Sequence, residues 1–238
     1  MWKSFIKIMP IIILVVVLDG LGWLLLSGNY TSFLHPRFGV FLFIGVLIIA
    51  GFFISFIIGG NPFSHCGLGD NAVRSLILIT PIIFMYTVAG QDMGSHALNM
   101  KMMDSYRNVI KGNTVTKDAS TSDGKSYKEM SILDIAMDIG KLNGQGVITH
   151  GHINKDSDLP EGYAVLYRFG LYCCAADAFP VWLIFKSTKL ASFENEIWIT
   201  VKGTVKLFTV NGKDIPVIMT DEVKEEKPPP PGERYLYF

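Results

Sequence analysis

The sequence predicts a membrane protein of two parts: three transmembrane helices, followed by a small, mainly β domain with an OB-like fold. Three observations lead to this fold class: scarce charge in the first 90 residues, long apolar runs in the same region, and alternating apolar and polar residues further along. Only six of the 21 basic and 21 acidic residues lie within residues 1–90. This unevenness excludes a single soluble domain, and the 50% content of hydrophobic residues excludes intrinsic disorder.

The predicted membrane region covers residues 1–91 and contains three apolar runs. Residues 8–27 match the roughly 20 residues that a helix needs to cross the hydrocarbon core. Residues 38–59 carry no charge, which leaves no soluble interpretation. Residues 75–90 form a shorter run that contains Pro81, and we interpret it as a third span rather than a buried amphipathic helix.

The basic residues that flank these runs are almost evenly divided between the two sides of the membrane. The first helix usually dominates orientation, so we expect the N-terminus in the cytoplasm. Three spans then place the C-terminal domain outside the cytoplasm.

Asp19 lies inside the first apolar run, where an uncompensated carboxylate costs a few kcal/mol. One interpretation is a contact with a partner membrane protein or an ion path. The other is a protonated side chain beside Gly20 and Gly22, packed against a neighbouring helix. Both interpretations require that this part of the helix packs against protein.

Residues 92–128 form a polar linker, and residues 129–238 form the predicted β domain. Glu129–Gly140 has the apolar spacing of one short amphipathic helix, with Gly140 in the position of a C-terminal cap. Five strands are predicted at 146–153, 163–173, 181–186, 196–210 and 215–222. Short strands with one helix in about 100 residues are typical of a small, partly open OB-like barrel.

Two features of this domain predict local structure. Gly203 lies within the fourth predicted strand and allows a bend or a bulge. Lys227–Phe238 begins as an extended polyproline segment and ends in an aromatic tail, which packs on the domain or lies at the membrane interface.

The adjacent pair Cys173 and Cys174 is the strongest candidate for chemistry. A disulfide between neighbouring cysteines strains the bond geometry. On a regular strand, Cys173 would join the apolar core face, with Arg168 and Cys174 on the opposite face. If the strand ends at Cys173 and a helical turn follows, Asp177 converges with both sulfurs. A metal or redox role and simple buried packing both stay open.

His150 and His152 are two positions apart on the first predicted strand, so their rings project from the same face. This pattern is a two-ligand half-site for Zn or Cu, although two exposed polar residues would give the same pattern. His65, Cys66 and Asp70 cluster in the loop after the second span as further potential ligands. A polar turn with a helix start at Asn71 is the better explanation of that cluster, because Gly and Asn fill the spaces between these residues.

Several function classes lack support in the sequence. There is no P-loop, nucleophile elbow, Cys-X-X-Cys, zinc-protease motif or dinucleotide fingerprint, so we predict no enzymatic activity. The net charge is zero, and acidic residues slightly outnumber basic ones beyond residue 90, so we also predict no nucleic-acid partner.

Five segments carry a family resemblance: YTSFLHPRFG, LITPIIFMYTVAG, RFGLYCCAADAFPVWL, IWITVKGTV and the closing PPPPGERYLYF. They resemble the bacterial YcgQ-like family of membrane proteins, described as permease subunits, and the Cys-Cys-Ala-Ala-Asp-Ala core is the most specific match. The resemblance implies an N-terminal helical hairpin, a third helix and a C-terminal β domain beside a multi-span permease. The family is often associated with metal handling, and some members carry a His-rich loop where this chain has only His65 and Cys66.

We therefore expect a non-enzymatic accessory subunit of a permease in the bacterial cell membrane, in contact with the lipid bilayer. Its extracytoplasmic β domain would capture or sense Zn or Cu, with Cys173, Cys174, Asp177, His150 and His152 as candidate ligands. The alternatives are a purely structural subunit and a membrane-anchored thiol redox protein.

Overall fold

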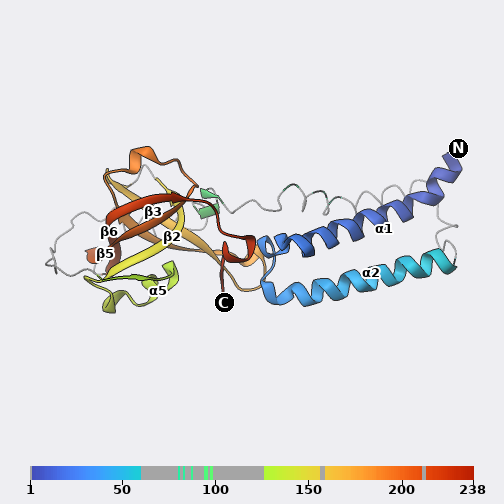
Figure 1. Ribbon diagram of the computed structural model, residues 1–238, viewed down its shortest axis with the longest axis horizontal. Coiled ribbons are helices and arrows are strands. Elements are labelled where there is room, and N and C mark those ends of the chain that lie inside the picture. The colour runs from blue at the N-terminus through green and yellow to red at the C-terminus, as the bar shows by residue number, and fades with distance from the viewer. Residues whose placement is uncertain are drawn as a thin grey trace. The chain divides into compact units, whose positions relative to one another are not determined.

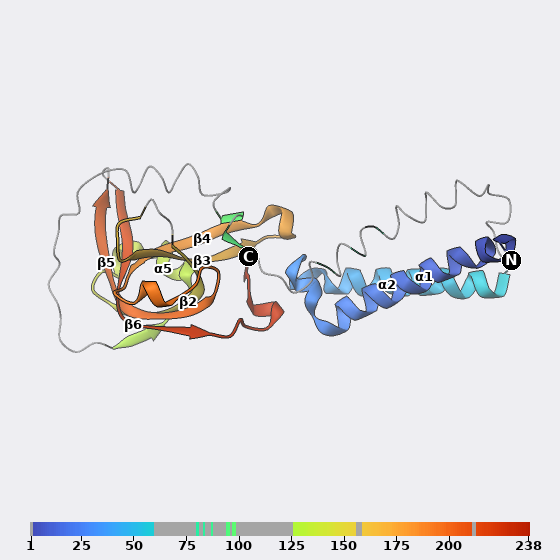
Figure 2. The ribbon, with the colours of Figure 1, turned by 90° about the horizontal axis from the view of Figure 1, so that it is seen from above.

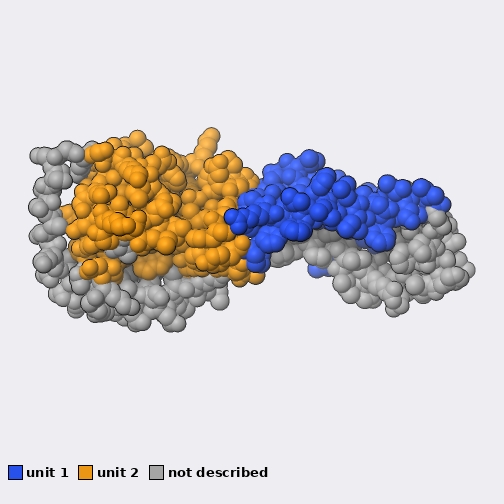
Figure 3. Space-filling model, turned by 90° about the horizontal axis from the view of Figure 1, so that it is seen from below, with its two compact units in different colours: residues 1–91, 173–175 blue, residues 92–172, 176–238 orange. Residues whose placement is uncertain are grey.

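The computed structural model describes residues 2–59, 126–155, 159–210 and 213–238, with isolated positions between 80 and 98. The chain forms two compact units, residues 1–91 with 173–175, and residues 92–172 with 176–238 (Figure 3). Of the predicted third span, the structure describes three positions. The rest of that span and most of the predicted linker lie outside the described residues.

The first unit contains two helices, α1 (Trp2–Ser27) and α2 (Gly39–Gly59), which lie side by side and antiparallel (Figures 1 and 2). Gly28 follows α1 with a φ of 71°, the left-handed conformation in which many helices end. Two 3₁₀ turns, Asn29–Ser32 and Pro36–Phe38, lead into α2.

The prediction of three transmembrane helices is only partly supported. Within the described residues, one stretch is long and apolar enough to cross a membrane, the 20 residues Pro36–Ser55 with a mean hydropathy of 2.7. The apolar part of α1, Ile12–Ser27, is shorter than the usual span. The stretch Pro36–Ser55 is therefore consistent with an association with the membrane.

The second unit is a mainly β domain of seven strands and one α-helix. The elements are β1 (Tyr127–Glu129), α5 (Ile132–Met137), β2 (Gly146–Asn154), β3 (Tyr163–Leu171), β4 (Phe179–Lys186), β5 (Trp198–Val210), β6 (Lys213–Glu226) and β7 (Leu236–Tyr237). The strand order is β1-β2-β5-β6-β4-β3-β7, and an additional pairing of β2 with β3 closes the five central strands into a ring. All five predicted strands are confirmed, with small differences at their ends.

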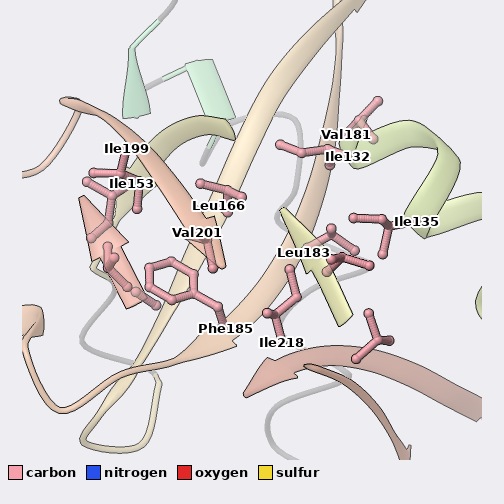
Figure 4. Packing of buried hydrophobic residues seen from close by; sticks show 14 of the residues in the cluster. Ile132, Ile135, Ile153, Leu166, Val181, Leu183, Phe185, Ile199, Val201 and Ile218 are labelled. Carbon is pink, nitrogen blue, oxygen red and sulfur yellow. The ribbon is translucent and has the colours of Figure 1, made fainter. Parts of the chain in front are cut away.

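The main core, the larger of the buried clusters, lies inside this ring and is covered by α5. Figure 4 shows Ile132 and Ile135 of α5 beside Val181 and Leu183 of β4. A capping box at Ser131 starts the helix, since the Ser131 hydroxyl accepts from the Asp134 amide at 3.1 Å. The predicted cap at Gly140 is wrong: α5 ends at Met137, and Gly140 belongs to the following 3₁₀ turn.

Both faces of β3 are buried, which corrects the prediction of one core face and one outer face. Ala164 and Leu166 face the main core. The alternate side chains belong to a second cluster, made of Leu98, Val165, Tyr167, Phe169, Leu171, Ala178 and Tyr235. Arg168, expected on the outer face, is only 8% exposed.

The bulge predicted at Gly203 is confirmed. Lys202 pairs with Glu222 but Gly203 pairs with Thr220, so Asp221 of β6 is the extra residue. The extra residue inverts the alternation along β6, and Ile218 and Val223 therefore both reach the main core.

Gly203→Ala tests the close packing at this bulge. A Cβ at this position would overlap the carbonyl oxygen of Met219, a backbone atom that cannot turn away as a flexible side chain can. We expect the substitution to cost more than about 1 kcal/mol and to lower the thermal midpoint of the full-length protein. Gly232→Ala is the matched control, because no atom lies within 4 Å of its added Cβ. Equal midpoints for the two variants would contradict this account.

A short segment near residue 95 is anchored on the β domain by Glu196. The Glu196 carboxylate accepts hydrogen bonds from the amide and the hydroxyl of Ser95 at 2.6 and 2.5 Å. Leu98 of the same segment is fully buried in the second cluster. Among the non-glycine residues that the structure describes, Glu196 is the one with a positive φ, 69°. The backbone at this anchor is therefore held in a conformation that is uncommon for a residue with a side chain.

The Ser95 hydrogen bonds lower the pKa of Glu196 from its ordinary value of 4.5. A lowered carboxyl pKa gives a stabilisation that is complete above about pH 4.5 and is lost as the pH falls through the folded-state pKa. We expect Ser95→Ala to reduce the thermal midpoint at neutral pH, with a difference from wild type that narrows below about pH 4. Thermal melts across this pH range measure the effect.

Ser192→Ala provides the control, because the Ser192 hydroxyl donates to the carbonyl oxygen of Lys189 rather than to a carboxylate. Its effect on the midpoint is expected to be independent of pH. A Ser95→Ala difference that stays constant down to pH 3 would refute the role of the Glu196 carboxylate.

Candidate metal centre

The candidate site is the turn that follows β3. The strand ends at Leu171, two residues before the predicted end, and a 3₁₀ turn covers Ala175–Asp177. Cys173 and Cys174 therefore lie on irregular backbone rather than on a strand. For that reason their side chains are not forced to opposite faces, as strand geometry would require.

Cys173, Cys174 and Asp177 converge, as predicted. The two sulfurs are 3.7 Å apart, and each lies within 4.8 Å of a carboxylate oxygen of Asp177. Both cysteines are reduced thiols, with Cys173 exposed and Cys174 partly exposed. The Asp177 Oδ1 accepts from the Tyr172 amide at 3.3 Å, which closes the turn.

The spacing of the sulfurs fits the ligand shell of a zinc ion. Two thiolates bound tetrahedrally to Zn at about 2.3 Å lie about 3.8 Å apart, close to the 3.7 Å between the Sγ atoms. The carboxylate of Asp177 offers a third ligand, and Zn and Cu(I) both accept thiolate ligands. This group of three leaves one tetrahedral position for water or for another donor.

The turn that carries the two cysteines, residues 172–177, is called the thiol turn, and its backbone pairs with the connection between α1 and α2. The His35 amide donates to the carbonyl of Cys173 at 3.0 Å, and the Ala175 amide donates to the carbonyl of Phe33 at 2.8 Å. Leu34 and Cys174 form the antiparallel bridge between these bonds. The main chain around both thiols is therefore hydrogen-bonded, while the thiol groups project from it.

His150 and His152 are not part of this group. They lie on one face of β2, as predicted, and His152 is 6% exposed. The centroid of its ring lies 4.4 Å from the ring centroid of Trp198 and 5.4 Å from that of Tyr167. The Nδ1 of His152 is 2.8 Å from the carbonyl oxygen of Glu196. Within the described ranges, neither imidazole belongs to a group of three potential metal ligands.

The second predicted cluster, His65, Cys66 and Asp70, lies outside the described residues. The sequence also showed no sign of a buried cation on β3, Arg168, which is 8% exposed. The Arg168 guanidinium donates to the backbone carbonyls of Glu233 and Arg234 and lies 5.5 Å from the Trp198 ring centroid. Burial lowers the pKa of Arg168, while Tyr237 and Glu233 oppose this shift.

Arg168 thus holds the C-terminal segment to the domain, and the described tail packs on the β domain. Tyr235 is 5% exposed in the second cluster, and β7 pairs in parallel with the end of β3. In the sequence, the aromatic residues of the tail indicated that the tail packs on another surface. No sequence pattern identified Arg168 as the residue that binds the tail.

Comparison with solved structures gives matches of low similarity. The S. pombe Stn1-ten1 complex matches at 14% identity with a TM-score of 0.23, over 34% of this chain and 58% of that chain. A protein from Leishmania major Friedlin described as an aspartyl-tRNA synthetase matches at 9% identity with a TM-score of 0.26, over 47% and 23%. The chain thus spans less than two thirds of each of these proteins, and such TM-scores support no argument about function.

No curated protein matches the chain. The family described as the DUF1980 C-terminal domain matches residues 98–238, more than half of the sequence. This match covers the thiol turn, the five central strands and the aromatic tail. The chain therefore belongs to the DUF1980 C-terminal domain family.

Proposed function

We propose that this protein is a non-enzymatic accessory subunit of a bacterial multi-span membrane permease, whose extracytoplasmic β domain captures or senses Zn or Cu. The observation that carries the metal function is the convergence of Cys173, Cys174 and Asp177, with sulfurs 3.7 Å apart. Two thiolates and a carboxylate suit soft or borderline cations and do not suit Mg or Ca. Exposure of Cys173 gives an ion access from solvent.

The architecture supports a membrane-anchored binding module. The ring β2-β5-β6-β4-β3, in which β4 and β6 are parallel, is consistent with the OB-like barrel that the sequence predicts. The membrane-length stretch Pro36–Ser55 would hold this domain at the bilayer. A binding domain fixed at the membrane raises the local concentration of an ion beside a transport protein.

A purely structural subunit is the second candidate, and one observation favours it. The thiol turn pairs through its backbone with residues 33–35, so the turn has a structural role whether or not a metal binds. The two candidates differ in what the thiols themselves do. A metal titration with thiol variants therefore separates them.

The full-length protein, purified in detergent with a phosphine reductant, is expected to bind about one Zn²⁺ per chain. Changing both Cys173 and Cys174 to Ser should weaken binding more than about 100-fold, because removing direct ligands exceeds the usual effect of outer contacts. Competition with a chromophoric chelator measures the affinity. Ser192→Ala is the control, because the Ser192 hydroxyl donates to the carbonyl oxygen of Lys189, and it should bind as the wild type does.

Asp177 allows a graded test within the same titration. In Asp177→Asn, the side-chain carbonyl oxygen still accepts the hydrogen bond from the Tyr172 amide, so this variant keeps the turn but loses the negative charge. About 10-fold weaker Zn²⁺ binding is expected. Asp177→Ala loses both and should bind more weakly still. Wild-type affinity in the double Ser variant would eliminate the metal function and leave the structural subunit.

Asp19 tests the permease partnership. Its side chain is exposed on α1, whereas Ile13, Gly20 and Leu24 on the same helix are buried. A carboxylate at membrane depth costs a few kcal/mol unless a partner compensates for it. Asp19→Leu should therefore reduce co-purification of a multi-span protein from native membranes at least about 5-fold.

Val16→Leu is the control for this experiment, because Val16 is also exposed on α1 but carries no charge. It should leave co-purification unchanged. Equal recovery with Asp19→Leu and Val16→Leu would place the partner contact outside α1.

A further inference from the structure

We infer that the C-terminal strand positions the thiol turn, so that metal binding and docking of this strand stabilise each other. The inference rests on the proposed metal function. In this inference, β7 and Phe238 supply no ligand to the metal. They hold the turn that carries the ligands in place.

The tail is joined to the strand that leads into the turn. Gly170 pairs with Leu236 and Leu171 pairs with Tyr237, and the Phe238 amide donates to the carbonyl of Leu171 at 3.3 Å. These bonds lie immediately before Tyr172 and the two cysteines. Docking of the tail thereby fixes the backbone at the point where β3 ends.

Three aromatic rings bracket the turn from both sides. The ring centroid of Phe238 lies 5.2 Å from that of Tyr172 and 5.2 Å from that of Phe179, and the centroids of these two rings are 5.3 Å apart. Tyr172 directly precedes Cys173, and Phe179 closely follows Asp177. Phe238 therefore holds together the two ends of the segment that carries all three ligands.

The fit around these rings is tight. A Cβ on Gly170 would lie 2.5 Å from Phe179 Cζ and 2.7 Å from Phe238 Cε2. The absence of a side chain at Gly170 is what lets both rings pack over the end of β3. Arg168 and the buried Tyr235 anchor the preceding tail residues, so Phe238 reaches the turn from a fixed segment.

This arrangement couples two equilibria. The ligands must be held close together for a metal to bind, and the tail supplies part of that preorganisation. A group that favours the bound geometry raises the affinity, and by thermodynamic reciprocity the metal favours the docked tail by the same factor.

The test uses the full-length protein in detergent with Zn²⁺ as the probe. Phe238→Ala is expected to weaken Zn²⁺ binding roughly 5- to 150-fold, the range of typical coupling factors. Phe238→Leu retains apolar volume and should restore part of the affinity. Phe208→Ala is the matched control, because Phe208 is a partly buried aromatic residue in a different cluster, packed with Ile184, Ile215 and Val217.

Hydrogen exchange supplies the reciprocal measurement. Zn²⁺ should slow exchange of the Phe238 amide several-fold in the wild type and not in the variant with Ser at positions 173 and 174. Without metal, Phe238→Ala should accelerate exchange of the Tyr172 amide, which donates to Asp177. Exchange of the Tyr172 amide that is faster in Phe238→Ala than in Phe208→Ala separates a local effect of the tail from a general loss of stability.

The outcomes separate the two proposals. A wild-type protein that binds no Zn²⁺ overturns the metal function and, with it, this coupling. Wild-type binding that Phe238→Ala leaves unchanged, or tail exchange that Zn²⁺ does not alter, overturns the coupling alone. Weaker binding in Phe238→Ala and in Phe208→Ala to the same extent also overturns it, because the effect is then global.

Discussion

Burial of β3 on both faces is the constraint on which the rest of the β domain depends. One set of its side chains, including Leu166, packs inside the strand ring, and the other, including Tyr167 and Phe169, packs in the second cluster. The strand ends at Leu171, and the chain leaves it through the turn that carries Cys173, Cys174 and Asp177. That exit creates the thiol turn and leaves the end of β3 available for pairing with β7.

The strands were predictable because their signal is local. Alternating or continuous apolar runs identified all five central strands, and Gly203 marked the bulge, since a glycine inside a paired strand signals close backbone approach. The helix end was predicted wrongly because Gly140 resembles a cap, whereas the chain had already left the helix at Asp138. The two-residue strand β7 and the three-residue strand β1 are too short to produce a periodic pattern, and only tertiary pairing reveals them.

The candidate site was predictable in part for the same reason. Cys173, Cys174 and Asp177 lie within one short segment, so a turn alone brings them together. His152 shows the limit of sequence pattern: its spacing from His150 suggested a ligand pair, but tertiary packing places its ring beside Trp198 and Tyr167. Arg168 was assigned to a solvent face because the groups that contact it, the Trp198 ring and the carbonyls of Glu233 and Arg234, are far from it in the sequence.

In the proposed site, the two thiolates and the carboxylate of one turn hold the metal. X-ray absorption spectroscopy of the zinc-loaded full-length protein tests this proposal, because it counts the sulfur atoms bound to the metal. The account predicts two sulfur neighbours at about 2.3 Å, with lighter oxygen or nitrogen ligands at about 2.0 Å completing the shell. A first shell without sulfur would contradict it and would place any bound zinc away from Cys173 and Cys174.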